Sequence, residues 1–220
     1  MIMKRTLFVL MMMVCAVMMS CNPTPDDGND LGNGTSNIGE VDGHEYVDLG
    51  LPSGLKWATC NVGATSPEEY GDYFAWGEIE AKDEYTAEKC STYGVVMNDI
   101  SGNVQYDAAS ANWGESWRMP TRFEYRELLQ NTKKTWTTQN GVNGYSMKST
   151  INGDSIFFPA AGYRYGLSFC FGSESEGNYW CSTPIELEIY VANNIDFSSA
   201  DYVMSCDYRF YGRTIRPVVK

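Results

Sequence analysis

"SWRMPTRFEYRELLQ", residues 116–130, predicts a short capped helix with a rigid start. Pro120 pushes the residue before it towards extended backbone, and Thr121 followed three positions later by Glu124 has the pattern of a capping box. The helix is therefore predicted to begin at Pro120–Thr121 and to end near Asn131. Three apolar residues share one helical face and are expected to lie in the core: Tyr125, Leu128 and Leu129.

The side chains around this helix start are of the kind that build a scaffold. Trp117 supplies a large apolar wedge, and Arg118 has five N–H donors that can reach backbone carbonyls of irregular loops. Tyr179 and Trp180 are expected to pack against them from an opposing strand. None of these side chains is a nucleophile or a base, so the motif favours structure over catalysis.

The first 21 residues, "MIMKRTLFVLMMMVCAVMMSC", have the order of a secretory signal: basic, apolar, then small. The apolar run has 13 residues, which is short for a membrane span of about 20. Residues 1–20 are therefore predicted to be a lipoprotein signal peptide. Cys21 after Ser20 resembles the bacterial lipobox, with Met18 where leucine is usual, and this likeness implies an acylated Cys21. A plain signal peptide with an incidental Cys21 is the alternative.

Residues 21–42 are predicted to be a flexible tether, because they are rich in Pro, Gly, Asp and Asn and carry few large apolar side chains. Asp26 and Asp27 resemble the acidic export signal of Bacteroidota surface lipoproteins. Residues 43–220 form the predicted domain.

Composition sets the class of the domain. Aromatic residues make up 14% of the chain, and 21 glycines accompany them, which favours a sheet- and loop-rich fold. The net charge is −12, and it becomes −14 without Lys4 and Arg5. Such a chain repels phosphate backbones, so no nucleic-acid partner is expected.

The order of apolar, polar and turn-forming residues along the domain predicts an α+β fold with two short helices, a twisted antiparallel sheet and long loops. The first helix is expected within 106–114, ending at Gly114. Strands are expected at 44–51, 55–62, 71–78, 189–197 and 214–219, with Pro217 at a strand end or on an edge strand. Asn152-Gly153 favours a hairpin turn between 144–149 and 155–164, and a similar strand–loop–strand pattern spans 169–184.

Six motifs follow one another between about residues 45 and 218. They are VDLGLPSGLKWATCNVG, YFAWGE, YDAASANWGESWRMPTRFEYRELL, NGDSIFFPAAGYR, YWCSTP and GRTIRPV. Together they make the chain resemble the Fibrobacter succinogenes major paralogous domain family of surface and secreted proteins. The Trp-Arg-Met-Pro-Thr run also looks like the helix start of the sulfatase-modifying-factor group. This resemblance implies a C-type-lectin-like fold, in which early strands and two helices precede a loop-rich sheet and the termini lie close together.

Catalytic interpretations find little support in the sequence. Formylglycine-generating members of the wider group need an activated cysteine pair, but Cys170, Cys181 and Cys206 lack the surrounding motif. His44, the sole histidine, would have to be the base of any triad. Ser53 lies between turn residues rather than at a strand-to-helix elbow. The chain is expected to be no enzyme and to need no cofactor, with a sulfatase-modifying-factor-like oxidase as the outside alternative.

Metal and disulfide patterns are also weak. A single histidine and the lack of a Cys-x-x-Cys pair argue against zinc, so no metal site is predicted. The acidic stretch 68–88 lacks the regular aspartate spacing of a calcium loop, although a structural calcium there stays an alternative. The cysteines outside the signal and Cys21 are five in number, and most are expected to be small buried residues. A bridge between Cys170 and Cys181, or one involving Cys206, is left open.

The aromatic residues are the better indication of function. Four tyrosines in Gly- or Arg-bearing turn regions are expected to be the most exposed, without defining a site: Tyr163, Tyr165, Tyr208 and Tyr211. Exposed rings can stack on sugars or peptides. We therefore expect a protein held in the bacterial outer membrane by its lipid, at the cell surface, that binds a glycan or a protein. A structural or assembly component of a surface appendage is the alternative.

Overall fold

The structure, a computed structural model, describes residues 37–167 and 169–220. These residues belong to one compact unit. The predicted signal peptide 1–20, Cys21 and the predicted tether up to residue 36 lie outside the described residues.

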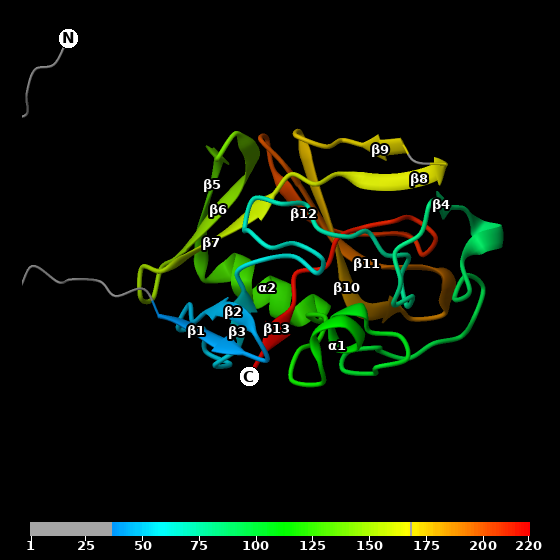
Figure 1. The fold of residues 1–220 in the computed structure, drawn as a ribbon, viewed down its shortest axis with the longest axis horizontal. Helices are drawn as coiled ribbons and strands as arrows, with labels where there is room; N and C mark the ends of the chain where they lie inside the picture. The colour runs from blue at the N-terminus through cyan, green and yellow to red at the C-terminus, as the bar shows by residue number, and fades with distance from the viewer. Residues whose placement is uncertain (1–36, 168) are drawn as a thin grey trace, which may run out of the picture. The chain divides into compact units, whose positions relative to one another are not determined.

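The two ends of the described domain meet in one sheet. Its strand order is β1 (Ile38–Val41), β2 (His44–Val47), β3 (Lys56–Ala58) and β13 (Val218–Val219), and every pair is antiparallel. The last residues of the chain therefore lie beside β3, as Figure 1 shows near the label C. β1 falls within residues 21–42, so the predicted tether extends too far and the domain begins before Gly43.

Both predicted helices form where their caps place them. α1 (Ala108–Trp113) begins after Asp107, whose side chain accepts hydrogen bonds from two backbone N–H groups, and it ends at Gly114. α2 (Arg122–Gln130) begins after Thr121 with the full capping box and ends before Asn131. A short 3-10 helix, η1 (Ala87–Lys89), lies in the long connection before α1. Local side-chain chemistry therefore fixes both helix starts.

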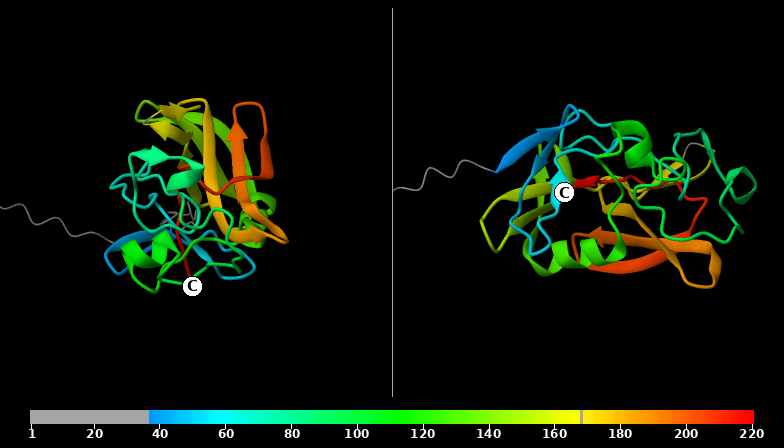
Figure 2. Two further views of the ribbon diagram at one scale, coloured as in Figure 1. Left: turned by 90° about the vertical axis from the view of Figure 1, so that its right-hand side faces the viewer. Right: turned by 90° about the horizontal axis from the view of Figure 1, so that it is seen from below.

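Three further antiparallel sheets complete the domain. β5 (Thr132–Gln139), β6 (Val142–Ser149) and β7 (Ser155–Pro159) form consecutive hairpins. β10 (Glu176–Ile185), β11 (Glu188–Ser198) and β12 (Tyr202–Tyr208) form the second, and β11 and β12 run side by side in both views of Figure 2. β4 (Glu84–Tyr85), β8 (Tyr163–Leu167) and β9 (Phe169–Phe171) form the third.

This confirms a mixed, sheet-rich domain with two α-helices among the described residues, and it corrects several details. Four sheets take the place of one twisted sheet. Residues 71–78 form no strand, because Phe74 makes a single bridge to Arg213 and the segment then turns. β9 and β10 do not pair as a hairpin, since β9 pairs with β8 and β10 with β11. Pro217 does precede a terminal strand at a sheet edge.

The core has two main parts, and adjacent residues of β10 belong to different ones. Tyr179 packs with Tyr125 of α2, whereas Trp180 packs with Trp117. Side chains alternate between the two faces of a strand, so the two rings point to opposite sides of the sheet. β10 therefore ties the α2 region to the aromatic residues before it.

Candidate functional site

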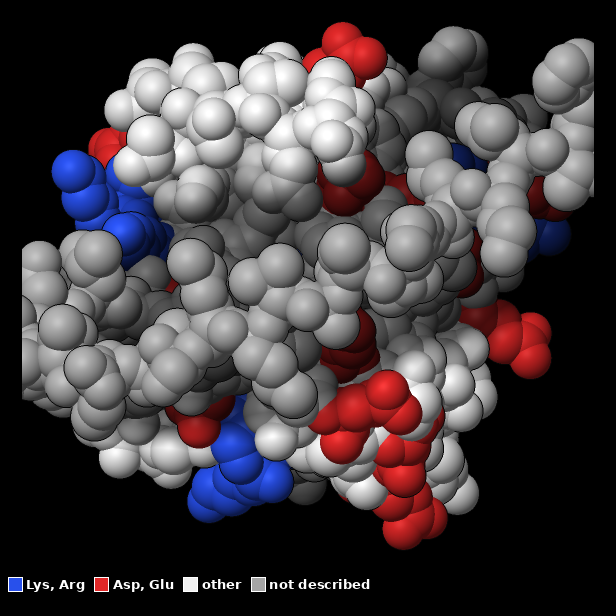
Figure 3. Space-filling view, turned by 60° about the vertical axis from the view of Figure 1, so that its left-hand side comes forward, with Lys and Arg blue, Asp and Glu red and all other residues white. Residues whose placement is uncertain are grey.

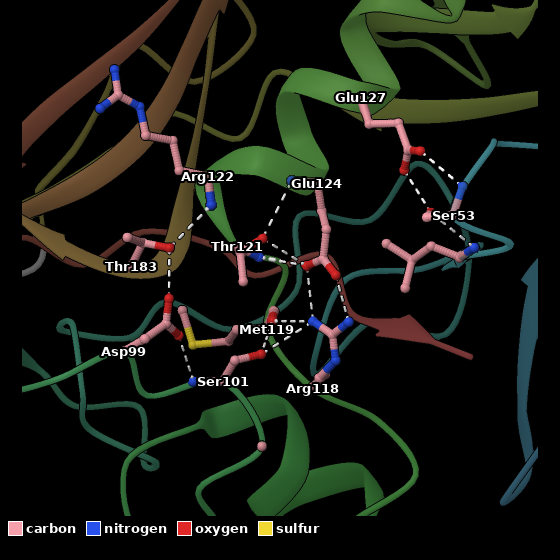
Figure 4. A network of polar contacts seen from close by, with 12 residues as sticks. Ser53, Asp99, Ser101, Arg118, Met119, Thr121, Arg122, Glu124, Glu127 and Thr183 are labelled. Atoms are coloured by element: carbon pink, nitrogen blue, oxygen red, sulfur yellow. Dashed lines mark hydrogen bonds and ion pairs between the residues drawn. The ribbon is translucent and has the colours of Figure 1, made fainter.

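The Trp117–Glu124 motif is a closed polar network at the start of α2 (Figure 4). The Thr121 hydroxyl accepts from the Glu124 backbone N–H, and the Glu124 carboxylate accepts from the Thr121 N–H at 2.7 Å. The Arg118 guanidinium donates hydrogen bonds to both oxygens of that carboxylate, at 2.8 and 2.5 Å. Among the described residues this guanidinium donates to one backbone carbonyl, that of Met119 at 3.3 Å, and otherwise to the side chains of Ser101 and Glu124, so the expected bonding to loop carbonyls occurs at a single position.

The remaining motif residues are buried. The Trp117 indole N–H donates to the Val41 carbonyl at 3.0 Å, and the Trp180 indole N–H donates to that of Phe74 at 2.9 Å. The Pro120 carbonyl accepts from the backbone of Ser182, which attaches the helix start to β10. The structure therefore places all six motif residues in internal packing and hydrogen bonding.

The residues considered for catalysis are engaged elsewhere. The Ser53 hydroxyl donates to Glu127 at 2.6 Å. His44 stacks on Trp113 with ring centroids 3.8 Å apart, and burial lowers its pKa. Cys181 is fully buried, which raises the pKa of its thiol and favours the protonated form.

The five cysteines of the described domain are all free thiols, so neither proposed bridge forms. Cys90 and Cys181 are buried, Cys60 is half-buried, and Cys170 and Cys206 are exposed, which departs from the expectation that most would be buried. No three His, Cys, Asp or Glu side chains of the described residues are grouped to hold a metal ion. Within 68–88, Glu68 instead binds Asn140.

Acidic side chains dominate parts of the surface. Figure 3 brings forward the side of the domain that lies to the left in Figure 1, where β5, β6 and β7 are. Carboxylates gather at the lower right of this view, whereas basic groups form separate clusters at the left and below. On this face acidic and basic side chains therefore lie in separate places.

A groove of about 500 Å3 lies on the surface of the domain. It is lined from β8, β10, β11 and β12 and by Arg213, and we call it the Asp196 groove. Register assembles it: Asn178 on β10 lies opposite Asp196 on β11, which lies opposite Val203 on β12. Directly opposed residues present their side chains on the same face. Three strands therefore bring their side chains to one wall.

Arg213 is the floor of the Asp196 groove. Its side chain is only 2% exposed, and it binds Asp196 at 2.5 Å and Asp207 at 2.6 Å. The guanidinium also lies 5.1 Å from the Trp180 ring centroid and 5.7 Å from that of Tyr163. A planar cation held by two carboxylates and two rings has little freedom, so the groove is preorganised.

Polar atoms at this floor lack partners. Asp196 Oδ1 accepts from Arg213, from Asn178 at 2.7 Å and from Asn194 at 2.7 Å. The Asn178 Oδ1 acceptor and the Arg213 Nε donor are both buried and unpartnered among the described residues. Buried polar groups normally find a partner. A ligand that both donates and accepts hydrogen bonds suits this floor.

An aromatic cluster continues from the groove wall. Tyr163 stacks on Phe171 at 5.6 Å and contacts Tyr211 at 5.3 Å, and Tyr165 contacts Tyr211 at 5.4 Å. Tyr208 stacks on Phe210 at 5.3 Å. The cluster comprises Tyr93, Tyr163, Tyr165, Phe171, Tyr190, Tyr208, Phe210 and Tyr211.

The four tyrosines that were expected to be exposed all lie in this aromatic cluster. Tyr165 and Tyr208 are 47% and 45% exposed, whereas Tyr163 and Tyr211 are half-buried. Burial and then the Asp207 carboxylate raise the pKa of Tyr163 and of Tyr211. These phenols therefore keep their protons at neutral pH and can act as donors.

The acidic and amide groups of the groove were missed by sequence reasoning. Asn194 and Asp196 stand two positions apart in the predicted strand 189–197, which places two polar side chains on one face. That alternation is the signal that could have indicated a polar wall. Asp207 and Arg213 gave no comparable signal, because the irregular turn after β12 brings them together.

No protein-family model, curated protein or solved structure matches the chain. The Asp196 groove must therefore be interpreted from its own geometry. No helix of the described residues has the length and apolarity to cross a membrane.

Proposed function

We propose that this protein is a lipid-anchored binding protein of the bacterial cell surface, and that its domain takes a glycan in the Asp196 groove without acting as an enzyme. The observation that carries the proposal is the meeting of a buried Arg213 paired with Asp196, unpartnered polar atoms and aromatic rings in one groove. Sugar hydroxyls both donate and accept hydrogen bonds, and sugar C–H faces stack on aromatic rings.

Two tyrosine rings supply the stacking surface. Tyr163 and Tyr202 line the Asp196 groove, and Tyr202 is 37% exposed. Lys134 lies 4.8 Å from the Tyr202 ring centroid, which helps to hold that ring in place. Rigid rings beside fixed polar groups bind with little loss of side-chain entropy.

The fold belongs to the same proposal. We propose a C-type-lectin-like domain of the Fibrobacter succinogenes major paralogous family. Early strands and two helices precede the larger sheets, and β3 pairs with β13 so that the ends of the domain adjoin. These features support the fold that the ordered sequence motifs imply.

The anchor rests on the sequence around Cys21. We propose that Cys21 becomes the acylated N-terminus and holds the protein in the outer membrane, at the cell surface. Palmitate labelling of intact cells, combined with protease shaving, tests both parts. Cys21→Ala should lose the label, and the wild-type protein should be cut by external protease. A wild-type protein that carries no label contradicts the anchor.

Binding is tested with a glycan array probed by the full-length protein in detergent. Wild type should bind at least one class of glycan, and Tyr202→Ala should weaken that binding. Tyr106→Ala removes an equally exposed ring outside the groove and should have no effect. An array without signal, or equal losses in both variants, rejects glycan binding at this groove.

A second function is favoured by β12. This strand stands at the edge of its sheet, and Tyr202, Val203 and Tyr208 on it are exposed. An open edge can accept a strand from another chain, so β12 suits an assembly component of a surface appendage. Light scattering separates the two functions, since assembly through β12 requires concentration-dependent oligomers that Val203→Pro abolishes.

A further inference from the structure

We infer that the Asp196 groove selects saccharides that carry a free amino group over neutral or acidic saccharides. This inference rests on the proposed glycan-binding function and adds the class of sugar. It is drawn from the charge, the unpartnered atoms and the shape of the groove.

The charge of the groove is strongly one-sided. Four carboxylates and one guanidinium line it, for a net formal charge of −3: Glu176, Asp196, Asp201, Asp207 and Arg213. The sole cation is already paired with two of the carboxylates. An acidic sugar would therefore meet uncompensated carboxylates, whereas a protonated amine would be attracted.

Two residues that line the groove, Asn178 and Arg213, each have a buried polar atom without a hydrogen-bond partner among the described residues. Asn178 is 4% exposed, and its buried Oδ1 needs a donor. Arg213 is 1% exposed, and its Nε needs an acceptor. An ammonium group donates three hydrogen bonds and accepts none, and a neighbouring hydroxyl can accept one. An amino sugar carries both groups on adjacent carbons, whereas a lysine side chain carries only the ammonium.

The carboxylates of the groove are not grouped as the ligands of a metal ion. Among the described residues no three acidic, histidine or cysteine side chains are close enough together to hold a metal ion. A spread of carboxylates around about 500 Å3 suits an organic cation better than a bare ion. Tyr163 and Tyr202 add ring faces that attract both a cation and a sugar C–H face.

The test compares oligosaccharides of one length by calorimetry with the full-length protein: a glucosamine oligomer, its fully N-acetylated form and a uronic acid oligomer. The pH is set so that the amine is protonated. The glucosamine oligomer should bind about tenfold more tightly than the acetylated form, because a charge-assisted hydrogen bond is roughly twice as strong as a neutral one. The uronic acid oligomer should not bind. Salt of about 1 M should reduce the preference, since the Debye length is then about 3 Å.

Two variants locate the effect. Glu176→Gln and Asp201→Asn alter exposed side chains, so the fold is expected to survive, and each should weaken glucosamine binding several-fold. Each should weaken binding of the glucosamine oligomer more than binding of the acetylated oligomer. Glu115→Gln removes an exposed charge outside the groove and is the matched control.

The outcomes separate the two proposals. Equal or tighter binding of the acetylated oligomer overturns the amino-sugar inference and leaves glycan binding in place. Binding of none of the three oligomers to a protein that also fails on the glycan array overturns both. A lysine-rich peptide that binds more tightly than the glucosamine oligomer, with the same loss in Asp201→Asn, assigns the groove to a protein partner and overturns the inference.

Discussion

The buried carboxylate of Asp107 holds several loop segments together through hydrogen bonds to their backbone. Asp107 is 0% exposed and accepts from four backbone N–H groups. Two of them belong to the first turn of α1, and the others belong to Gly102 and Met119. One side chain thus caps a helix and joins it to the segment that leads into α2.

Replacing Asp107 by alanine should be among the more damaging single changes. Asp107→Ala leaves four backbone donors without their acceptor, and each buried unsatisfied group costs about 1–3 kcal/mol before relaxation and water entry reduce the sum. We expect the free energy of unfolding to fall by about 3 kcal/mol in urea denaturation. Asp83→Ala, at an exposed position, should change it by less than about 0.5 kcal/mol. Equal effects of the two variants would contradict the role given to Asp107.

Glu124 makes stability depend on pH in the acid range. Burial opposes its charge, but hydrogen bonds from Arg118 and Thr121 outweigh burial and lower the pKa of Glu124. A carboxylate with a lowered pKa in the folded state stabilises the fold above its unfolded pKa of about 4.3, and this stabilisation is lost as pH falls through the folded pKa. Wild type should therefore exceed Glu124→Gln in stability at neutral pH.

The measurement is urea unfolding of both proteins across a pH series. The difference between wild type and Glu124→Gln should stay constant above about pH 5.5 and shrink towards lower pH. Glu115→Gln, at an exposed position, provides the comparison for the loss of a charge. A difference that grows as the pH falls has the wrong sign for this interpretation.

At the scale of strands, close approach between β10 and β11 sets the shape of the groove wall. Gly177 lies opposite Phe197, and a Cβ built at Gly177 would come within 2.0 Å of the Phe197 ring. That ring is buried and stacks on Tyr145 at 4.8 Å and on Tyr179 at 5.8 Å. It cannot move without disturbing the core.

Gly177→Ala should therefore destabilise the protein through overpacking. We expect a loss of about 2–3 kcal/mol, because extra atoms in a packed core force side chains and backbone to shift. Gly43→Ala is the comparison: its Cβ meets nothing within 4 Å, and it bears only the strain of a positive φ of 79°, about 1 kcal/mol. Thermal unfolding followed by circular dichroism ranks the two variants. A Gly177→Ala protein as stable as Gly43→Ala would refute the close packing.

Elements with local signals were predictable from the sequence. The capping box at Thr121 and Glu124 gave α2 within a residue or two, and Asn152-Gly153 gave the hairpin of β6 and β7. The strand predicted at residues 71–78 was wrong. Aromatic residues favour strands, but Phe74 and Trp76 are buried by packing in the core and not by pairing within a sheet. In this segment the high content of aromatic residues indicates burial and not strand pairing.

At the scale of the whole domain, the sites come from segments that the sequence keeps far apart. The Asp196 groove draws on β8, on three strands of another sheet and on Arg213 beyond them. The sequence alone identified tyrosines as candidate ligand contacts, because a residue type can be recognised without knowing which residues lie beside it in the fold. Long-range register brought Asn178 to Asp196, and no local pattern specifies that pairing. The scaffold role of the motif was therefore easier to predict than the groove.

Glycan binding in the Asp196 groove is tested most directly by nuclear magnetic resonance of the full-length protein labelled at its tyrosine rings. Titration with a glucosamine oligomer should shift the signals of Tyr163 and Tyr202, which line the groove, and leave Tyr106 unchanged. Single Tyr→Phe variants assign the signals. Shifts confined to tyrosines outside the groove, or no shift at saturating oligomer, would contradict the claim that this groove holds a sugar.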